Sequence, residues 1–154
     1  MKYVGIDPGS KAGWAVLDGT GYRVGSGTWD CRVRRGEGAG FRFIRLRGHL
    51  VELLDSLSND CTLAYEEVRR HMGVDAAHVY GAIVGHLQEL CEVRGVPYTR
   101  IPVGTVKKHA TGKGNADKTA MLLAAATRWG SWPIADDNEA DALWIASALR
   151  EGIA

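Results

Sequence analysis

Two acids of this sequence directly follow short apolar segments, a placement that favours chemistry by carboxylate groups. Asp7 follows residues 3–6, and Glu66 follows residues 62–65. If each segment is a buried strand, each acid lies at the carboxyl end of a strand, where ligands gather in open α/β sheets. Right-handed crossover connections favour the two strands as parallel neighbours. We therefore expect the two carboxylates to lie side by side.

A third acidic segment, residues 136–141, begins the last predicted helix. Asp136 and Glu139 have the spacing of a capping box, in which both side chains serve the helix N-terminus. Asp137 and Asp141 are four residues apart and therefore lie on one helix face. The partial positive charge of a helix N-terminus stabilises ionised carboxylates there. This face is expected to complete the acidic site formed by the two strand ends.

Carboxylates held side by side repel one another unless a cation lies between them. Hard oxygen ligands of this kind suit Mg²⁺ or Mn²⁺ rather than zinc. Four such ligands can hold two cations about 4 Å apart, an arrangement used for phosphodiester hydrolysis. The acidic residues therefore predict a site for two Mg²⁺ or Mn²⁺ ions.

Other reactive motifs do not fit. Residues 112–119 superficially resemble a phosphate-binding P-loop, but Asp117 stands where that motif has glycine before its lysine. The five histidines show no zinc-protease spacing, and Ser10 lies in no nucleophile elbow. The three cysteines form no Cys-x-x-Cys pair, which argues against a disulfide framework and a thiolate zinc site and favours a reducing cytoplasm.

Composition excludes several classes of protein. Of the 154 residues, 45% are hydrophobic and 24% are charged, which is typical of a soluble globular domain rather than a disordered or collagen-like chain. No apolar run approaches the ~18 residues of a membrane span. The first residues reach Asp7 too soon for a signal peptide. We expect a single domain over 1–154 with no membrane partner.

Basic residues are segregated from acidic ones along the chain, although the net charge is only +1. Residues 32–47 contain six arginines and one acid, and residues 94–118 contain six basic residues and one acid. Segregated charge can form a phosphate-binding face without a high isoelectric point. For any single arginine, a plain solvated surface role is equally open. The candidates for DNA binding are Arg32, Arg34, Arg35, Arg69, Arg70, Lys107, Lys108 and Lys113.

Hydrophobic periodicity and turn residues predict the elements that would position these groups. The predicted strands lie at 3–6, 13–17, 22–29, 62–65 and 98–101. The predicted helices lie at about 40–57, from Asp75 as the cap to Arg94, at 105–109, at 116–129 and from about 136 to 151. Three strands followed by alternating helices and strands imply an α/β fold with a mixed five-stranded sheet flanked by helices.

Several of these segments resemble the motifs of the RuvC family of Holliday-junction resolvases. Its first, second and final motifs are matched by residues 5–10 with 13–16, by 64–68 and by 140–146. Glu66 falls in the catalytic place of the second motif. Lys107 and Lys118 fall where the family has functional lysines. The resemblance covers nearly the whole chain at matching length.

This resemblance implies an RNase H-like fold, a homodimer, and nicking of four-way DNA junctions with Mg²⁺ or Mn²⁺, in recombination, repair or phage genome processing. It implies that Asp7, Glu66 and Asp141 bind metal, and that one metal activates water for in-line attack. Products would carry 5′-phosphate and 3′-hydroxyl ends. Lys118 would contact or stabilise the scissile phosphate as a further catalytic residue.

Two positions depart from the family pattern. Asn138 stands where the family usually has Asp or His, and asparagine cannot act as a base. We therefore expect Asp137 to fill the fourth catalytic and metal-binding position, with Glu139 in reserve. After Glu66 the family often carries aromatic residues, whereas residues 68–72 are Val-Arg-Arg-His-Met, which alters or removes the expected sequence preference.

Alternatives are open on the sequence alone. The helix over about 76–93, with Gly81 and Gly85 spaced for close packing, is either the dimer helix of the family or a plain core helix. A two-fold dimer would place two active sites symmetrically against a two-fold junction. The same acids are compatible with an RNase H-like nuclease that cuts flaps, forks or RNA–DNA hybrids. Asn138 is compatible with a non-catalytic junction-binding protein.

Overall fold

The order of strands and helices agrees with the sequence prediction, and each boundary lies within two residues of it. The computed structural model describes residues 1–71 and 73–153. The strands are β1 (Lys2–Asp7), β2 (Lys11–Leu17), β3 (Arg23–Asp30), β4 (Cys61–Glu67) and β5 (Tyr98–Pro102). The helices are α1 (Phe41–Ser56), α2 (Val74–Arg94), α3 (Val103–Thr111), α4 (Lys118–Trp129) and α5 (Asp137–Arg150).

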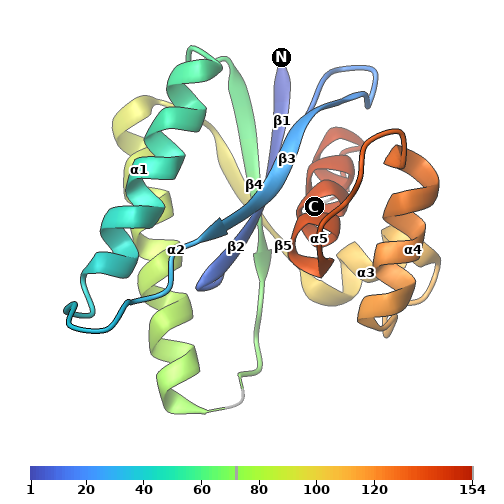
Figure 1. The fold of residues 1–154 in the computed structure, drawn as a ribbon. Helices are drawn as coiled ribbons and strands as arrows, with labels where there is room; N and C mark the ends of the chain where they lie inside the picture. Colours follow the sequence, from blue (N-terminus) through green and yellow to red (C-terminus); the bar gives the residue numbers. More distant parts are fainter. Residues whose placement is uncertain (72, 154) are drawn as a thin grey trace.

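The strands form one mixed sheet in the order β3-β2-β1-β4-β5. β1 pairs antiparallel with β2 and parallel with β4, and β4 pairs parallel with β5. The predicted α/β fold with a mixed five-stranded sheet is therefore confirmed. Figure 1 shows β1 and β4 running in the same direction, so their carboxyl ends share one edge of the sheet.

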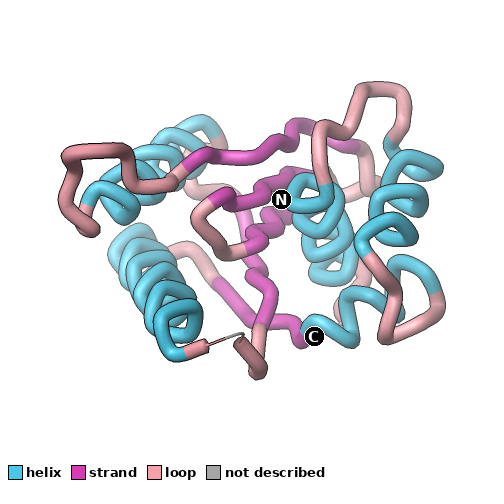
Figure 2. Tube along the Cα trace, turned by 60° about the horizontal axis from the view of Figure 1, so that its bottom comes forward, coloured by secondary structure: helices cyan, strands magenta, loops and turns pink. Residues whose placement is uncertain are grey.

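Helices cover both faces of the sheet. α1 and α2 lie on one face, and α3, α4 and α5 lie on the other (Figures 1 and 2). Leu46, Leu50 and Leu54 of α1 are fully buried in the first core, because residues that recur every four positions lie on one face of a helix. The second core includes α5, whose residues 142–148 are all buried.

Two glycines allow α5 to lie very close to β1 and β2. A Cβ atom at Gly13 would lie 1.9 Å from the backbone oxygen of Asn138, and one at Gly5 would lie 2.2 Å from that of Ala142. No side chain fits at such distances unless the backbone shifts. Gly13 is also the sheet partner of Asp7. The start of α5 is therefore placed over the strand end that carries Asp7.

Helix starts differ from the prediction in two places. Gly73 is the N-cap of α2, and Asp75 lies in its first turn without capping it, so the predicted cap was wrong. α4 begins at Lys118, two residues later than predicted, because Asp117 accepts a hydrogen bond from the Ala120 N–H at 2.8 Å and caps the helix there. Within the described residues, no helix is both long and apolar enough to span a membrane.

Candidate active site

The two strand-end acids lie side by side at the carboxyl edge of the sheet. Ile6 pairs with Tyr65 across the parallel strands β1 and β4, so the residues that follow, Asp7 and Glu66, are neighbours. Side chains alternate between the faces of a sheet, and Ala64 packs in the core that contains α5. Glu66, two residues later, and Asp7 beside it therefore face α5.

α5 brings two further carboxylates, Asp137 and Asp141, to the same place. Burial raises the pKa of Asp7 well above its ordinary value, and the negative charges of Glu66, Asp141 and Asp137 raise it further. The carboxyl groups of Asp7 and Glu66 also share a hydrogen bond. We call these four residues the acidic cluster. They come from three separate elements, β1, β4 and α5.

Burial also raises the pKa of Glu66 and Asp141. It raises the pKa of Glu66, against the hydrogen bond from Asp7 and the positive charge of Lys107, which both lower it. The pKa of Asp141 is raised to about 7, first by burial and then by the neighbouring carboxylates, while Lys107 and Lys118 lower it. Carboxylates perturbed in this way take up a cation in exchange for protons.

The acidic cluster suits a hard divalent cation in its chemistry, because all its donors are carboxylate oxygens. Carboxylate repulsion adds to burial in raising the pKa of Asp7 and Asp141, and a bound cation would relieve that repulsion. Across residues 1–71 and 73–153, however, no three His, Cys, Asp or Glu side chains converge tightly enough to hold a metal ion as they stand. Binding would therefore require these carboxylates to rotate inward about their χ angles.

The structure separates the three candidates for the fourth acidic position. Glu139 is buried and pairs with Arg23 at 2.7 Å, so the reserve role expected for it is wrong. The backbone of Asn138 packs against β2. Asp137 contributes negative charge at Asp7. Asp137 is the residue of the three that joins the other cluster acids.

Two lysines border the acidic cluster in different ways. Lys107 of α3 is half-buried and lies close enough to lower the pKa of both Glu66 and Asp141. Lys118, the first residue of α4, has a side chain that is 86% exposed, and its Nζ lies 3.5 Å from Asp137 Oδ2. Lys107, which we expected to contact DNA, therefore also compensates charge inside the site, whereas Lys118 lies at its outer rim.

The loop between β3 and α1 presents its arginines unequally. Arg32 is held by Asp30, to which it donates two side-chain hydrogen bonds of 2.8 and 2.9 Å. Arg34 and Arg35 are exposed, and within the described residues their side chains form no ion pair. Arg34 and Arg35 are therefore freer to meet a phosphate than Arg32.

Arg45 of α1 stabilises this loop. It donates to Glu37 Oε1 at 2.7 Å and to the carbonyl oxygen of Arg32 at 3.1 Å. Glu37 also accepts from the backbone N–H of Arg34 at 2.6 Å. Sequence reasoning missed this role, because a separation of eight residues across a loop and a helix matches no regular spacing.

The remaining basic candidates lie on segments that flank the acidic cluster. The exposed ones are Arg69, Arg70, Lys108 and Lys113. Arg69 Nε lies 3.5 Å from Glu67 Oε1. Figure 1 places the chain after β4, α3 and the β3–α1 loop in the lower half of the view, toward which β1 and β4 run. Met72, in the stretch where the family often has aromatic residues, lies outside the described residues.

Tyr80 of α2 fixes the chain as it leaves the acidic cluster. Its hydroxyl donates to the carbonyl oxygen of Glu66 at 2.7 Å and accepts from the N–H of Val68 at 3.1 Å. A cavity of about 380 Å³ lies beside it, between residues 8–10 and α2. Tyr80 gave no sequence signal, because a tyrosine within a helix is most often a core residue.

We predict that Asp141→Asn stabilises the cation-free protein at pH 8. In the folded wild type this carboxyl holds its proton up to about pH 7, far above its unfolded pKa of about 3.9. The free energy of unfolding therefore falls as pH rises between those values and is lowest above them. A neutral amide escapes this loss, so the variant should gain roughly 1–3 kcal/mol at pH 8 and little at pH 4.

Urea denaturation in a chelator at the two pH values measures this difference. Asp60→Asn is the matched control, because this exposed acid lies just before β4, at the opposite end of that strand. A gain for Asp141→Asn that is the same at pH 4 and pH 8 would contradict the electrostatic account.

Comparison with known proteins gives one family. No protein-family model matches the chain. The chain is 33% identical over 125 residues to a crossover junction endodeoxyribonuclease RuvC of Magnetococcus marinus, an alignment that covers 79% of this chain and 68% of that protein. Two Thermus thermophilus RuvC structures share its fold.

The first of these structures, a complex with a Holliday junction substrate, has a TM-score of 0.84 at 24% identity and covers 99% of this chain and 97% of its own. The second has a TM-score of 0.78 at 25% identity and covers 99% of this chain and 98% of its own. The expected RNase H-like fold is thereby confirmed. On the strength of the sequence alignment, this chain belongs to the RuvC family of crossover junction endodeoxyribonucleases.

Proposed function

We propose that this protein nicks four-way DNA junctions by divalent-cation-dependent hydrolysis and leaves 5′-phosphate and 3′-hydroxyl ends. One observation carries the proposal. Asp7 and Glu66 on adjacent parallel strands face the acidic side of α5, at an edge flanked by exposed basic segments. Family membership makes the chain an endodeoxyribonuclease, and this edge is where its chemistry would occur.

Asp7, Glu66, Asp137 and Asp141 would hold two Mg²⁺ or Mn²⁺ ions. When bound, such ions activate water and stabilise the charge that develops on the phosphate. Asp7, Glu66 and Asp141 must release protons to bind them, and the raised pKa values of these three residues set the pH at which this occurs. Activity is therefore expected to rise toward alkaline pH.

Two lysines, Lys107 inside the site and Lys118 at its rim, complete the charge balance. Lys107 offsets the negative charge of Glu66 and Asp141. Lys118 is exposed beside Asp137 and would contact the scissile phosphate. Both side chains keep substrate phosphate from meeting four uncompensated carboxylates.

DNA contacts outside the site would be made mainly to phosphates, which fix position without reading sequence. Selectivity for a branched substrate then depends on where the basic segments lie around the acidic cluster. The residues proposed for these contacts are Arg32, Arg34, Arg35, Arg69, Arg70, Lys107, Lys108 and Lys113. The three cysteines are buried and unpaired with one another, which supports a reducing, cytoplasmic location.

We also propose that α2 mediates a homodimer. Ile83, Leu87 and Leu90 are buried against the chain's own sheet, so they are unavailable to a partner. Gly81 and Gly85 instead lie on the exposed side, where an added Cβ would meet nothing within 4 Å. A row of small residues lets a second helix approach closely, and a two-fold dimer would match a two-fold junction.

The decisive experiment is the nicking of a synthetic mobile four-way junction in Mg²⁺, in Mn²⁺ and in chelator. We expect cation-dependent nicks in the junction and far fewer in a fork, a plain duplex or an RNA–DNA hybrid. Asp7→Asn should lower cleavage by at least 10³-fold while junction affinity stays within a few-fold, because only a site ligand is lost.

Three outcomes would contradict the proposal. Preferred cutting of a fork, flap or hybrid would indicate another RNase H-like nuclease. Tight junction binding without nicks in Mn²⁺ would indicate a non-catalytic binding protein. Equal cleavage by wild type and Asp7→Asn would show that the chemistry occurs elsewhere.

Replacing the free arginines of the β3–α1 loop should weaken DNA binding in a salt-dependent way. Each lost phosphate contact lowers the slope of log affinity against log salt by about one. The double variant Arg34→Ala/Arg35→Ala should therefore lower the slope by about two. Arg32→Ala is the single-site comparison and should lower the slope by less than either Arg34→Ala or Arg35→Ala alone, because Asp30 already holds that side chain. Equal effects from all three positions would show that the loop does not face DNA as proposed.

The dimer proposal is tested by Gly81→Arg/Gly85→Arg. Arginine has a higher helix propensity than glycine, so α2 itself is not weakened, but two long charged side chains would block a close helix partner. Light scattering should show a dimeric wild type and a monomeric variant. A monomeric wild type at the assay concentration would contradict the proposal.

A further inference from the structure

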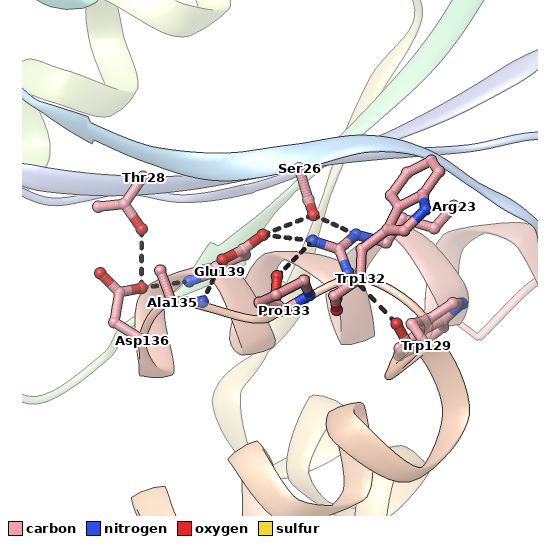
Figure 3. Close-up of polar contacts among 9 residues, drawn as sticks. All are labelled: Arg23, Ser26, Thr28, Trp129, Trp132, Pro133, Ala135, Asp136 and Glu139. Atoms are coloured by element: carbon pink, nitrogen blue, oxygen red, sulfur yellow. Dashed lines mark hydrogen bonds and ion pairs between the residues drawn. The ribbon is translucent and has the colours of Figure 1, made fainter.

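A buried ion pair joins β3 to the first turn of α5, as Figure 3 shows. The side chains of Arg23 and Glu139 are 7% and 4% exposed, and Arg23 Nη2 lies 2.7 Å from Glu139 Oε1. A buried ion pair of this kind is costly to desolvate, so it is weak evidence for stability as such. Its role is better sought in what it holds in place.

The guanidinium of Arg23 also donates hydrogen bonds to the chain between α4 and α5. Nη1 donates to the carbonyl oxygens of Trp129 at 3.2 Å and Trp132 at 2.9 Å. Nη2 also donates to the carbonyl oxygen of Pro133 at 3.1 Å, and Nε donates to Ser26 Oγ at 2.7 Å. The chain from 130 to 136 forms neither helix nor strand. One side chain thus supplies the hydrogen bonds that regular structure would otherwise supply.

Glu139 is held by three donors. Its Oε1 accepts from Arg23 and from the Ser26 hydroxyl at 2.8 Å, and its Oε2 accepts from the backbone N–H of Ala135 at 2.7 Å. These donors come from β3 and from the chain that leads into α5. The carboxylate therefore has one fixed position, on the side of α5 that faces β3.

Asp136 provides a second tie between the same elements. It caps α5 by accepting the Glu139 N–H at 2.9 Å, and its Oδ1 also accepts from the Thr28 hydroxyl at 2.7 Å. Only half of the predicted capping box is therefore correct, because the Glu139 side chain turns to Arg23 instead of to the Asp136 N–H. Both ties end on β3.

The geometry of a helix links this anchor to the acidic cluster. Glu139 lies two residues from both Asp137 and Asp141, and at 3.6 residues per turn a step of two residues is about 200°. Asp137 and Asp141 therefore point away from β3 when Glu139 points toward it. Rotation of α5 about its own axis would move both cluster carboxylates away from Asp7 and Glu66.

We propose that the Arg23–Glu139 pair is a positioning device that sets the rotation of α5 and thereby aims Asp137 and Asp141 into the acidic cluster. This inference rests on the proposed nuclease function. Arg23 and Glu139 act through the helix and touch neither substrate nor cation. A pair with only a structural role would affect stability without affecting the chemical step.

The test is the double variant Arg23→Met/Glu139→Met. It removes both buried charges together, so neither is left uncompensated, and hydrophobic replacements of buried ion pairs commonly fold. With the tether lost, kcat for junction nicking should fall ~10–100-fold. KM, junction affinity and the circular dichroism spectrum should stay near wild type. The single variant Arg23→Lys, with Glu139 unchanged, keeps the positive charge but not the planar fork of the guanidinium. It should therefore retain only part of the wild-type kcat.

The matched control is Arg150→Met/Glu151→Met, which removes the Arg–Glu pair at the other end of α5. Its kcat should equal that of wild type. Wild-type kcat in the folded Arg23→Met/Glu139→Met variant would overturn the proposal. If that variant does not fold, Ser26→Ala/Thr28→Val removes two of the ties to β3 and carries the same measurements.

Amide hydrogen exchange provides a readout that does not depend on activity. Exchange in residues 137–141 should accelerate in the Arg23→Met/Glu139→Met variant and stay unchanged in the control. Unchanged exchange there would also overturn the proposal. If wild type does not nick junctions but exchange does accelerate, the proposed function fails while the positioning role stands.

Discussion

The rest of this structure depends on one constraint: carboxylates that repel one another must be held close together in a partly buried site. Four acids that would separate in a flexible chain are held together, and burial first, then the charge of the neighbouring carboxylates, raises the pKa of Asp7 and Asp141. Side chains alone cannot enforce such proximity, so the backbone must. Two acids are fixed by the register of β1 with β4, and two by one face of α5. Both supports are regular elements, which locate groups more exactly than loops do.

The site requires α5 to lie unusually close to the sheet and in one fixed rotation about its axis. Gly5 and Gly13 remove the side chains that would keep the helix away from the sheet, and Arg23 with Glu139 holds it from the side of β3. Neither feature is expected to add much to the stability of the fold, because glycine weakens a strand and a buried ion pair is costly to desolvate. Under the proposed function, both features serve the placement of Asp137 and Asp141.

The parts of this structure that follow from local patterns could be predicted, and the parts that depend on distant partners could not. Periodicity gave the strands and helices, and the rule that ligands gather at strand ends singled out Asp7 and Glu66. Arg23 and Glu139 are 116 residues apart, so no spacing connects them. The capping-box spacing misassigned Glu139, since a buried guanidinium is a stronger partner than a backbone N–H. Asp75 shows the same limit, because a plausible cap residue need not occupy the cap position.

Burial of negative charge also explains how a chain of nearly zero net charge can serve a polyanionic substrate. The formal value of +1 counts all 18 acidic residues as ionised. The acidic cluster departs from that assumption at Asp141, whose pKa is raised to about 7, first by burial and then by the neighbouring carboxylates. The charge of the protein below about pH 7 is therefore more positive than the formal value, while Arg34 and Arg35 are exposed at the surface. Proton uptake by an acid inside the site thus makes the protein less negative without any additional basic residue.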